Sequence, residues 1–142
     1  MINIYIATSV KSLKRLNGSA CIVLENLENK GNAVTIFGKI LEKTKNGAEL
    51  TTFKNALLRI VNREELTVYT DNPYLSSAFE QGWLKKWQEN GWKTAKGTEV
   101  ENKADWEEVL KLLNGSRPTF KVKEPHEYKM WMEKELEKRG KQ

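Results

Sequence analysis

The sequence predicts an α/β fold whose elements follow the order βββαβαααβα. Three observations support this prediction: a series of short β-rich runs near the N-terminus, a change to helical spacing at Leu50, and a later alternation of strand-like and helical segments. The chain contains no internal repeat, low-complexity tract or linker, so we expect a single domain over residues 1–142. The order of the elements alone leaves several α/β arrangements open.

The N-terminal part of the chain is expected to form three antiparallel strands and one helix. The strands correspond to short apolar or β-rich runs, separated by turns that contain lysine, asparagine and glycine: Ile2–Ala7, Ala20–Glu25 and Ala33–Phe37. The period then changes to that of a helix, with one apolar face made of Leu50, Phe53, Leu57, Ile60 and Val61. Such a face indicates a helix that packs against the core.

The next segment is predicted to contain a strand and two helices. Thr67–Thr70 is a β-branched and aromatic run that Asp71 closes, and Asn72-Pro73 supplies an N-cap and a first-turn proline for the next helix. We expect helices over Tyr74–Gln81 and Trp83–Glu89, the second ended by an Asn-Gly pair. Because Asp71 stands at the carboxyl end of a strand, it is expected to face the crevice in which α/β sheets bind ligands.

The C-terminal part is expected to add a helix, a strand and a final helix. Asn102 is the predicted N-cap of the first helix, with Asp105 as its acidic partner, and the apolar stripe consists of Trp106, Val109, Leu110 and Leu113. Thr119–Lys123 is the predicted last strand. A charged helix is expected over His126–Arg139, with one side formed by Tyr128, Trp131, Met132 and Leu136.

The composition is that of a soluble globular protein, with 39% hydrophobic and 30% charged residues. The N-terminal segment lacks the basic region and cleavage pattern of a secretory signal, and no transmembrane segment is present, so no membrane partner is expected. Cys21 is the single cysteine, which excludes an internal disulfide and favours a reducing compartment such as the cytoplasm. The formal net charge of +5 suits a polyanionic partner.

Positive charge is concentrated in a tryptophan-rich segment. Between Trp83 and Gly97 the chain has four lysines and one glutamate, a net charge of +3. Lysines that attract phosphate, interleaved with large aromatic side chains, are typical of a nucleic-acid site. A purely structural alternative is that the tryptophans are packing residues and the lysines form a solvated face.

This region resembles the ribonuclease HI family, whose fourth strand ends in a similar Tyr-Thr-Asp before a helix. Further residues fall in the order and spacing of that family's basic protrusion, the helix and loop that grip a DNA strand: Trp83, Trp87, Gly91, Trp92, Lys93, Thr94, Val100, Asn102 and Trp106. Upstream, Glu49-Leu50 is similar to the Glu-Leu at the start of the family's first helix. The resemblance implies a ribonuclease H-like fold with a five-stranded mixed sheet, three strands antiparallel and then two parallel, flanked by helices and carrying a basic protrusion.

The resemblance also implies a set of nucleic-acid-binding residues, with an RNA/DNA hybrid as the expected partner. Asn46 matches a family asparagine that reads the minor groove and the 2′-hydroxyls. The protrusion contributes Trp83, Lys85, Lys86, Trp87, Trp92, Lys93 and Lys96. Pro73, in contrast, stands where the family has a glutamine that contacts bases.

Two of the family's catalytic acids are matched and one is missing. Two-metal phosphodiester cleavage needs several convergent carboxylates, because divalent ions about 3.5–4 Å apart repel each other and must be bridged by anions. Glu49 and Asp71 match the family's second and third acids, but Ala7 stands at the position of the first. The implied cofactor is therefore Mg²⁺ or Mn²⁺, bound weakly and as one ion, with Glu49 and Asp71 as its ligands.

The fourth acidic position of the family has several candidates here. Glu133 and Glu135 would need a shifted helix to reach the metals, and His126 aligns with the family's loop histidine only across a gap. Each of the matched acids also has a structural alternative. Glu49 could interact with a helix macrodipole, and Asp71 could merely precede a capped helix.

Three functional hypotheses follow from the sequence. The first is a ribonuclease H-like protein that binds nucleic acid, RNA/DNA hybrid being the expected ligand, with cleavage weak or lost. The second is an active hybrid endoribonuclease that uses Glu49 and Asp71 with a recruited Glu133, Glu135 or His126. The third is a protein-interaction module on a retained fold, with an exposed apolar patch near Met130 and Trp131.

Overall fold

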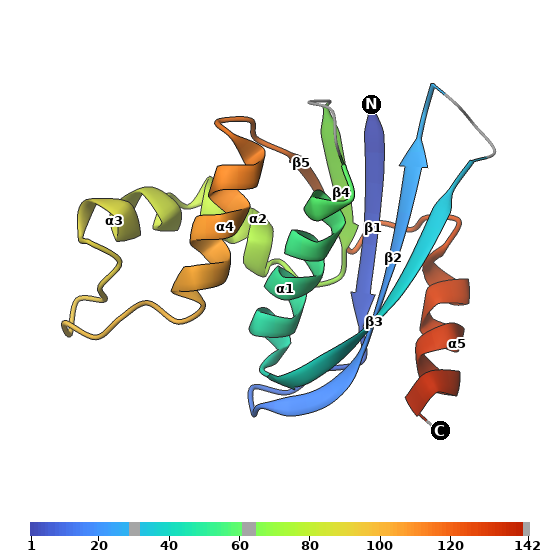
Figure 1. Ribbon diagram of the computed structural model, residues 1–142, viewed down its shortest axis with the longest axis horizontal. Coiled ribbons are helices and arrows are strands. Elements are labelled where there is room, and N and C mark those ends of the chain that lie inside the picture. Colours follow the sequence, from blue (N-terminus) through green and yellow to red (C-terminus); the bar gives the residue numbers. More distant parts are fainter. Residues whose placement is uncertain (29–31, 61–64, 141–142) are drawn as a thin grey trace.

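A five-stranded sheet forms the centre of the computed structural model, which describes residues 1–28, 32–60 and 65–140 (Figure 1). Its strands lie in the order β3-β2-β1-β4-β5. The first three strands pair antiparallel, whereas β4 is parallel to β1 and β5 is parallel to β4. The predicted mixed sheet is confirmed, and its strands are β1 (Ile2–Thr8), β2 (Leu16–Asn26), β3 (Val34–Lys43), β4 (Leu66–Thr70) and β5 (Thr119–Val122).

Helices cover both faces of this sheet. One face carries α1 with α4 packed beside it, and α5 lies on the opposite face (Figure 1). No helix among the described residues has the length and apolar character needed to cross a membrane. The helices are α1 (Lys45–Leu58), α2 (Tyr74–Glu80), α3 (Trp83–Glu89), α4 (Lys103–Leu113) and α5 (Lys129–Gly140).

Alternating side chains of β1 supply the core on each side of the sheet. Ile4 and Ile6 pack into the larger core, which α1 and α4 close with Phe53 and Trp106. Tyr5 points to the other face and packs with Cys21, Val23, Met132 and Leu136. This alternation is the period of two that a strand buried on both faces requires.

Several predicted boundaries were wrong, because backbone pairing extends β2 and β3 into segments where many side chains are exposed. β2 begins at Leu16 instead of Ala20, and β3 runs to Lys43 instead of Phe37. α1 begins at Lys45, since Thr44 caps it by accepting a hydrogen bond from the Gly47 backbone N–H at 3.1 Å. Leu50, Phe53 and Leu57 are buried as expected, Ile60 follows the helix end, and Val61 lies outside the described residues.

Two predicted N-caps have different roles in the structure. Asn72 precedes the N-cap position of α2, and its side-chain oxygen accepts a hydrogen bond from the Tyr74 N–H at 3.0 Å. Asn102 is the N-cap residue of α4 but makes no side-chain cap, because its φ of 66° is left-handed. Asp105 instead accepts hydrogen bonds from Lys54 at 2.8 Å and Thr51 at 3.0 Å. These contacts join α4 to α1.

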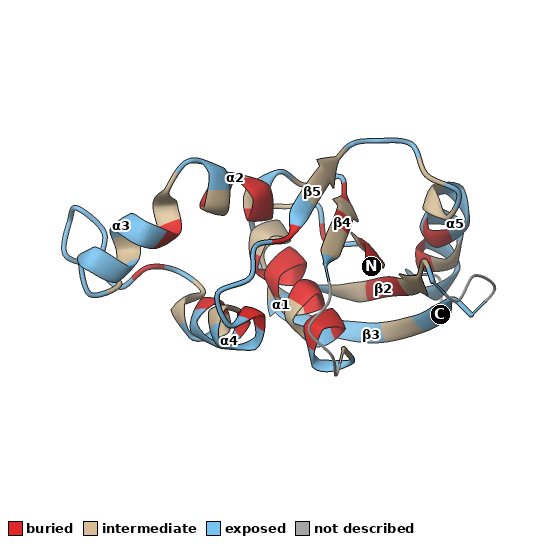
Figure 2. Ribbon diagram, turned by 90° about the horizontal axis from the view of Figure 1, so that it is seen from above, coloured by how far each residue is buried: buried red, intermediate tan, exposed pale blue. Residues whose placement is uncertain are grey.

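A projecting arm, residues 83–101, consists of α3 and the loop that follows it. Figure 2 shows the arm to be exposed along most of its length. Its tryptophans form a series of tilted ring contacts that reaches the core, with ring centroids 6.2 Å apart for Trp83–Trp87 and Trp87–Trp92, and 6.3 Å apart for Trp87–Trp106. Within the loop, the buried Val100 donates its N–H to the carbonyl of Trp92 at 2.8 Å. The arm is therefore a folded projection anchored by aromatic packing.

Candidate functional site

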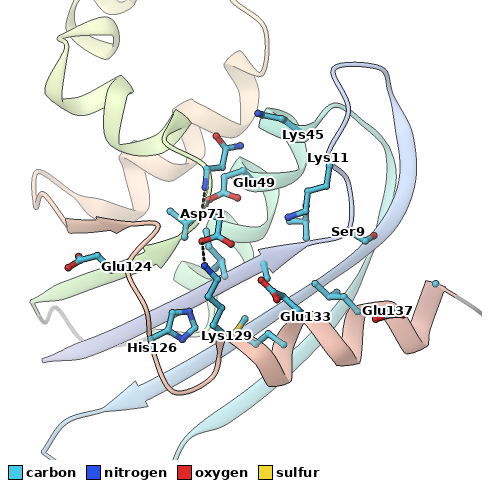
Figure 3. A pocket seen from close by; sticks show the side chains of 18 residues that line it. Ser9, Lys11, Lys45, Glu49, Asp71, Glu124, His126, Lys129, Glu133 and Glu137 are labelled. Atoms are coloured by element: carbon cyan, nitrogen blue, oxygen red, sulfur yellow. Dashed lines mark hydrogen bonds and ion pairs between the residues drawn. The ribbon is translucent and has the colours of Figure 1, made fainter.

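A pocket of about 560 Å³ opens at the carboxyl ends of β1 and β4, between α1 and α5 (Figure 3). These two strands run parallel, so their ends meet at one edge of the sheet. The pocket lining includes Ala7, Glu49, Asp71, His126, Lys129 and Glu133. Residues from four separate parts of the sequence are thus brought to one site.

Glu49 forms the floor of the pocket. It lies in the second turn of α1 and is 4% exposed, and its carboxylate accepts a hydrogen bond from the Thr70 hydroxyl. Burial raises the pKa of Glu49 to about 7, although the Thr70 hydrogen bond and the charge of Lys11 act in the opposite direction. At neutral pH this carboxyl is therefore divided between its protonated and ionised forms.

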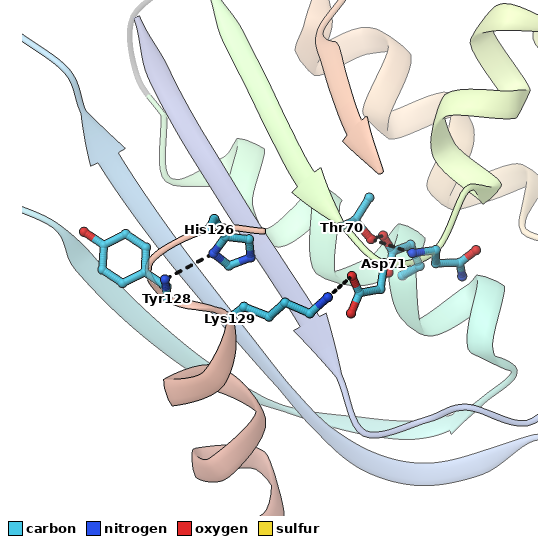
Figure 4. A network of polar contacts seen from close by, with 7 residues as sticks. Thr70, Asp71, His126, Tyr128 and Lys129 are labelled. Carbon is cyan, nitrogen blue, oxygen red and sulfur yellow. Dashed lines mark hydrogen bonds and ion pairs between the residues drawn. The ribbon is translucent and has the colours of Figure 1, made fainter. Parts of the chain in front are cut away.

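Asp71 lies at the pocket rim and is paired with a lysine. Lys129, the first residue of α5, places its ammonium 3.2 Å from Asp71 Oδ1 (Figure 4). The neighbouring Asn72 donates its backbone N–H to Thr70 Oγ1 at 3.1 Å and its amide Nδ2 to Asn46 Oδ1 at 3.1 Å. Asn46 is therefore joined to the residues that follow β4.

His126 lies in the loop before α5. The helix begins at Lys129, three residues later than predicted. Its Nδ1 accepts the backbone N–H of Tyr128 at 3.2 Å (Figure 4). The ring packs on Tyr5 with centroids 4.6 Å apart and on Tyr69 at 5.6 Å. Burial lowers the pKa of His126, so its neutral form is favoured.

Glu133 and Glu135, the two glutamates of α5 that are candidates for the fourth acidic position, differ in whether they line the pocket. Glu133 lines the pocket and points toward it in Figure 3. Glu135 is not among the lining residues and pairs with Lys138 at 3.3 Å. Ala7 lines the pocket beside Glu49 and Asp71, but its methyl group offers no ligand atom.

The residues of this pocket do not fit a two-metal centre. Within residues 1–28, 32–60 and 65–140, no three histidine, cysteine or acidic side chains are grouped so that they could hold a metal ion. The Glu49 carboxylate is bound by Thr70, and Asp71 is bound by Lys129. Two bridged divalent ions need more free carboxylate oxygens than this arrangement supplies.

The arm presents its lysines to solvent. Lys85, Lys86, Lys93 and Lys96 are exposed, whereas Trp83, Trp87 and Trp92 are half-buried against the larger core. All residues of the arm are described by the structure, and none lines the pocket. The arm and the pocket are therefore two separate surfaces of the same molecule.

Among the pocket residues that the sequence did not predict, three interact with Glu49 or Asp71: Lys11, Thr70 and Lys129. Thr70 could have been found, because it immediately precedes Asp71 at the end of a predicted strand. Lys129 and Asp71 are 58 positions apart, and the charge patterns used for helices detect only pairs three or four residues apart. Sequence spacing therefore contained no signal for this ion pair.

Comparisons with known proteins agree with this fold. A family model described as RNase H matches residues 2–127. Ribonuclease H from Chlorobaculum parvum is 43% identical over 81 residues, which cover 56% of this chain and 56% of the relative. The matched segment thus spans about half the length of that curated relative.

Solved structures show the same architecture. A type 1 RNase H with the type 2 active-site motif superposes with a TM-score of 0.69 at 18% identity, covering 96% of this chain and 70% of the other. The foamy viral protease-reverse transcriptase, solved in complex with an RNA/DNA hybrid, has a TM-score of 0.66 at 16% identity, covering 98% of this chain and 19% of the other. With the family model matching most of its length, the chain belongs to the RNase H family.

Proposed function

We propose that this chain binds nucleic acid, with an RNA/DNA hybrid as its ligand, and that its cleavage activity is weak or lost. One observation carries the proposal: Ala7, Glu49 and Asp71 line the same pocket in a member of the RNase H family. The pocket keeps two acids but holds a methyl group at the position assigned to a third. Binding therefore has more structural support than catalysis.

The arm supports binding through charge. Four exposed lysines lie on one projection, and each phosphate that a lysine neutralises releases counterions from the nucleic acid. The half-buried tryptophans hold the projection in place and leave part of their ring surface accessible. In this proposal the arm attracts one strand and the pocket receives the other.

The loss of cleavage follows from the number of ligands. Glu49 and Asp71 would be the ligands of at most one weakly held Mg²⁺ or Mn²⁺, and that ion would have to compete with the Lys129 ammonium at Asp71. A second divalent ion, which would supply positive charge for the cleavage reaction, would lack the third carboxylate needed to hold it.

A second candidate function is hybrid cleavage with a rearranged set of groups. Glu133 and His126 both line the pocket, so either could act beside Asp71. A metal-dependent cleavage assay on a labelled hybrid tests this candidate. Activity that disappears in the Asp71→Asn variant would establish cleavage at this site, and activity that persists would indicate a contaminating nuclease.

Binding is tested by titrating the protein into labelled RNA/DNA hybrid, duplex DNA and duplex RNA and following fluorescence anisotropy at several salt concentrations. We expect the hybrid to bind most tightly, with an affinity that falls steeply with salt. The Lys85→Gln/Lys86→Gln variant should reduce the logarithmic salt slope by about 1.8, roughly 0.9 for each phosphate that a lysine no longer neutralises. The matched control is Lys134→Gln/Lys138→Gln, which removes the same charge from α5 outside the pocket lining.

The proposal would be refuted if the protein showed no preference in binding among RNA/DNA hybrid, duplex DNA and duplex RNA. That result would favour the protein-interaction hypothesis instead, because Met130 is 69% exposed and Trp131 is 41% exposed on α5.

A further inference from the structure

The pocket contains a cation that belongs to the chain itself. The Lys129 ammonium lies 3.2 Å from Asp71 Oδ1 and reaches it from the opposite wall of the pocket (Figures 3 and 4). A metal that bound Asp71 at this oxygen would have to displace the ammonium. The family's metal chemistry and the residues of this chain therefore disagree at Asp71.

The position of Lys129 is fixed by the packing of α5. Met132 and Leu136 are 1% and 6% exposed and anchor the helix to the sheet. At its start, the Lys129 N–H donates to the His126 carbonyl at 3.3 Å. The helix therefore holds the lysine over the end of β4.

Lysines balance the two central acids of the pocket. Lys129 contacts Asp71, and the positive charge of Lys11 acts on Glu49 from the loop between β1 and β2. Two lysines face two acids, one of which is partly protonated at neutral pH, so this group carries no excess negative charge that would attract a divalent cation. An ammonium has three N–H donors, however, and Asp71 occupies one of those of Lys129. The side chain of Lys129 is 35% exposed, so its remaining donors are accessible from the pocket.

We propose that Lys129 takes the place of a divalent ion in ligand binding, by donating to Asp71 and to a phosphate oxygen of the bound strand at the same time. An ammonium placed between a carboxylate and a phosphate oxygen can donate a hydrogen bond to each, and it supplies one positive charge between these two anions without a metal. Binding of nucleic acid at this pocket is then independent of divalent cations. The inference rests on the proposed function, because it assumes that a phosphodiester strand enters the pocket.

The test measures hybrid binding by anisotropy in EDTA and in MgCl₂ at matched ionic strength. Wild-type affinity should be the same in both buffers. The Lys129→Gln variant should bind about fivefold more weakly, and its salt slope should fall by about 0.9, the value for one phosphate left without its lysine. The matched control is Lys138→Gln, which removes an exposed lysine of α5 that pairs with Glu135 outside the pocket lining. It should change neither quantity.

The outcomes distinguish failure of the Lys129 inference from failure of the proposed function. Hybrid binding that requires Mg²⁺, or a Lys129→Gln variant that behaves like Lys138→Gln, would overturn the role of Lys129 and leave the proposed function standing. Absence of hybrid binding in both buffers would overturn the proposed function and the Lys129 inference with it. Binding in EDTA, weakened specifically by Lys129→Gln, supports both.

Discussion

The buried carboxyl of Glu49 predicts an unusual dependence of stability on pH. Its pKa is about 7 in the folded protein against 4.5 as the ordinary value. Below about pH 4.5 the Glu49 carboxyl is protonated in both the folded and the unfolded protein, so its full contribution to stability is present. As the pH rises from there to about 7, this carboxyl loses its proton in the unfolded chain but keeps it in the folded protein. The free energy of unfolding therefore decreases with rising pH over this range. At about 1.4 kcal/mol per pH unit over roughly 2.5 units, the loss amounts to about 3 kcal/mol.

The Glu49→Gln variant removes this titration while keeping the shape of the side chain. We expect its free energy of unfolding, relative to wild type, to increase by about 3 kcal/mol between pH 4 and pH 8. Urea unfolding followed by circular dichroism measures the difference at each pH. Glu107→Gln, at an exposed position of α4, is the control and should show a much smaller change. A Glu49→Gln difference that stays constant across the pH range would refute the argument from burial.

Three further predictions concern the pocket and the packing around it. Ala7→Asp adds a third carboxylate to the pocket and should tighten Mn²⁺ binding about tenfold in calorimetric titration; unchanged affinity would contradict the placement of this side chain. Asp105→Ala should lower the free energy of unfolding by about 2 kcal/mol in urea, because Lys54 loses its nearer partner at 2.8 Å, retaining Glu108 at 3.9 Å, and Thr51 loses its acceptor; no loss would show that the Lys54–Asp105 pair is not formed. Burial would raise the pKa of Asp105, but the hydrogen bond and charge of Lys54 hold it below the ordinary value, so this stabilisation should be lost only as pH falls below about 4. Gly18→Ala should cost about 1–3 kcal/mol, since the new Cβ would lie 2.5 Å from a serine hydroxyl, whereas Gly38→Ala has open space and should be nearly neutral; equal melting temperatures would argue against the close approach.

Hydrophobic patterning located the elements of this fold but not their ends. The helical stripe that begins at Leu50 placed α1 correctly, because Leu50 and Phe53 are fully buried. The first turn of α1 was missed, since Thr44 specifies it through a hydrogen bond and not through an apolar side chain. The outer parts of β2 and β3 were missed for a related reason: backbone pairing continues there although many side chains are exposed.

The candidate site was only partly accessible from the sequence. A resemblance in motifs identified Glu49 and Asp71, and the structure places both on one pocket. The sequence resemblance gave no indication that α5 would bring Lys129 to Asp71, because that contact depends on how the final helix packs on the sheet. The same packing of α5 turns Glu133 toward the pocket and Glu135 away from it, because residues two positions apart on a helix lie on different faces.

The tryptophan series places most of the protein's intrinsic fluorophores in one region. Four of its five tryptophans are Trp83, Trp87, Trp92 and Trp106, which form a continuous series of ring contacts from the arm to the interior. The fifth, Trp131, lies apart and packs beside Phe37. Four of the five indole groups of this chain therefore lie on a single projection and at its base. A shift of the projection against the body should therefore change the tryptophan emission of unlabelled protein, without a dye attached to either partner.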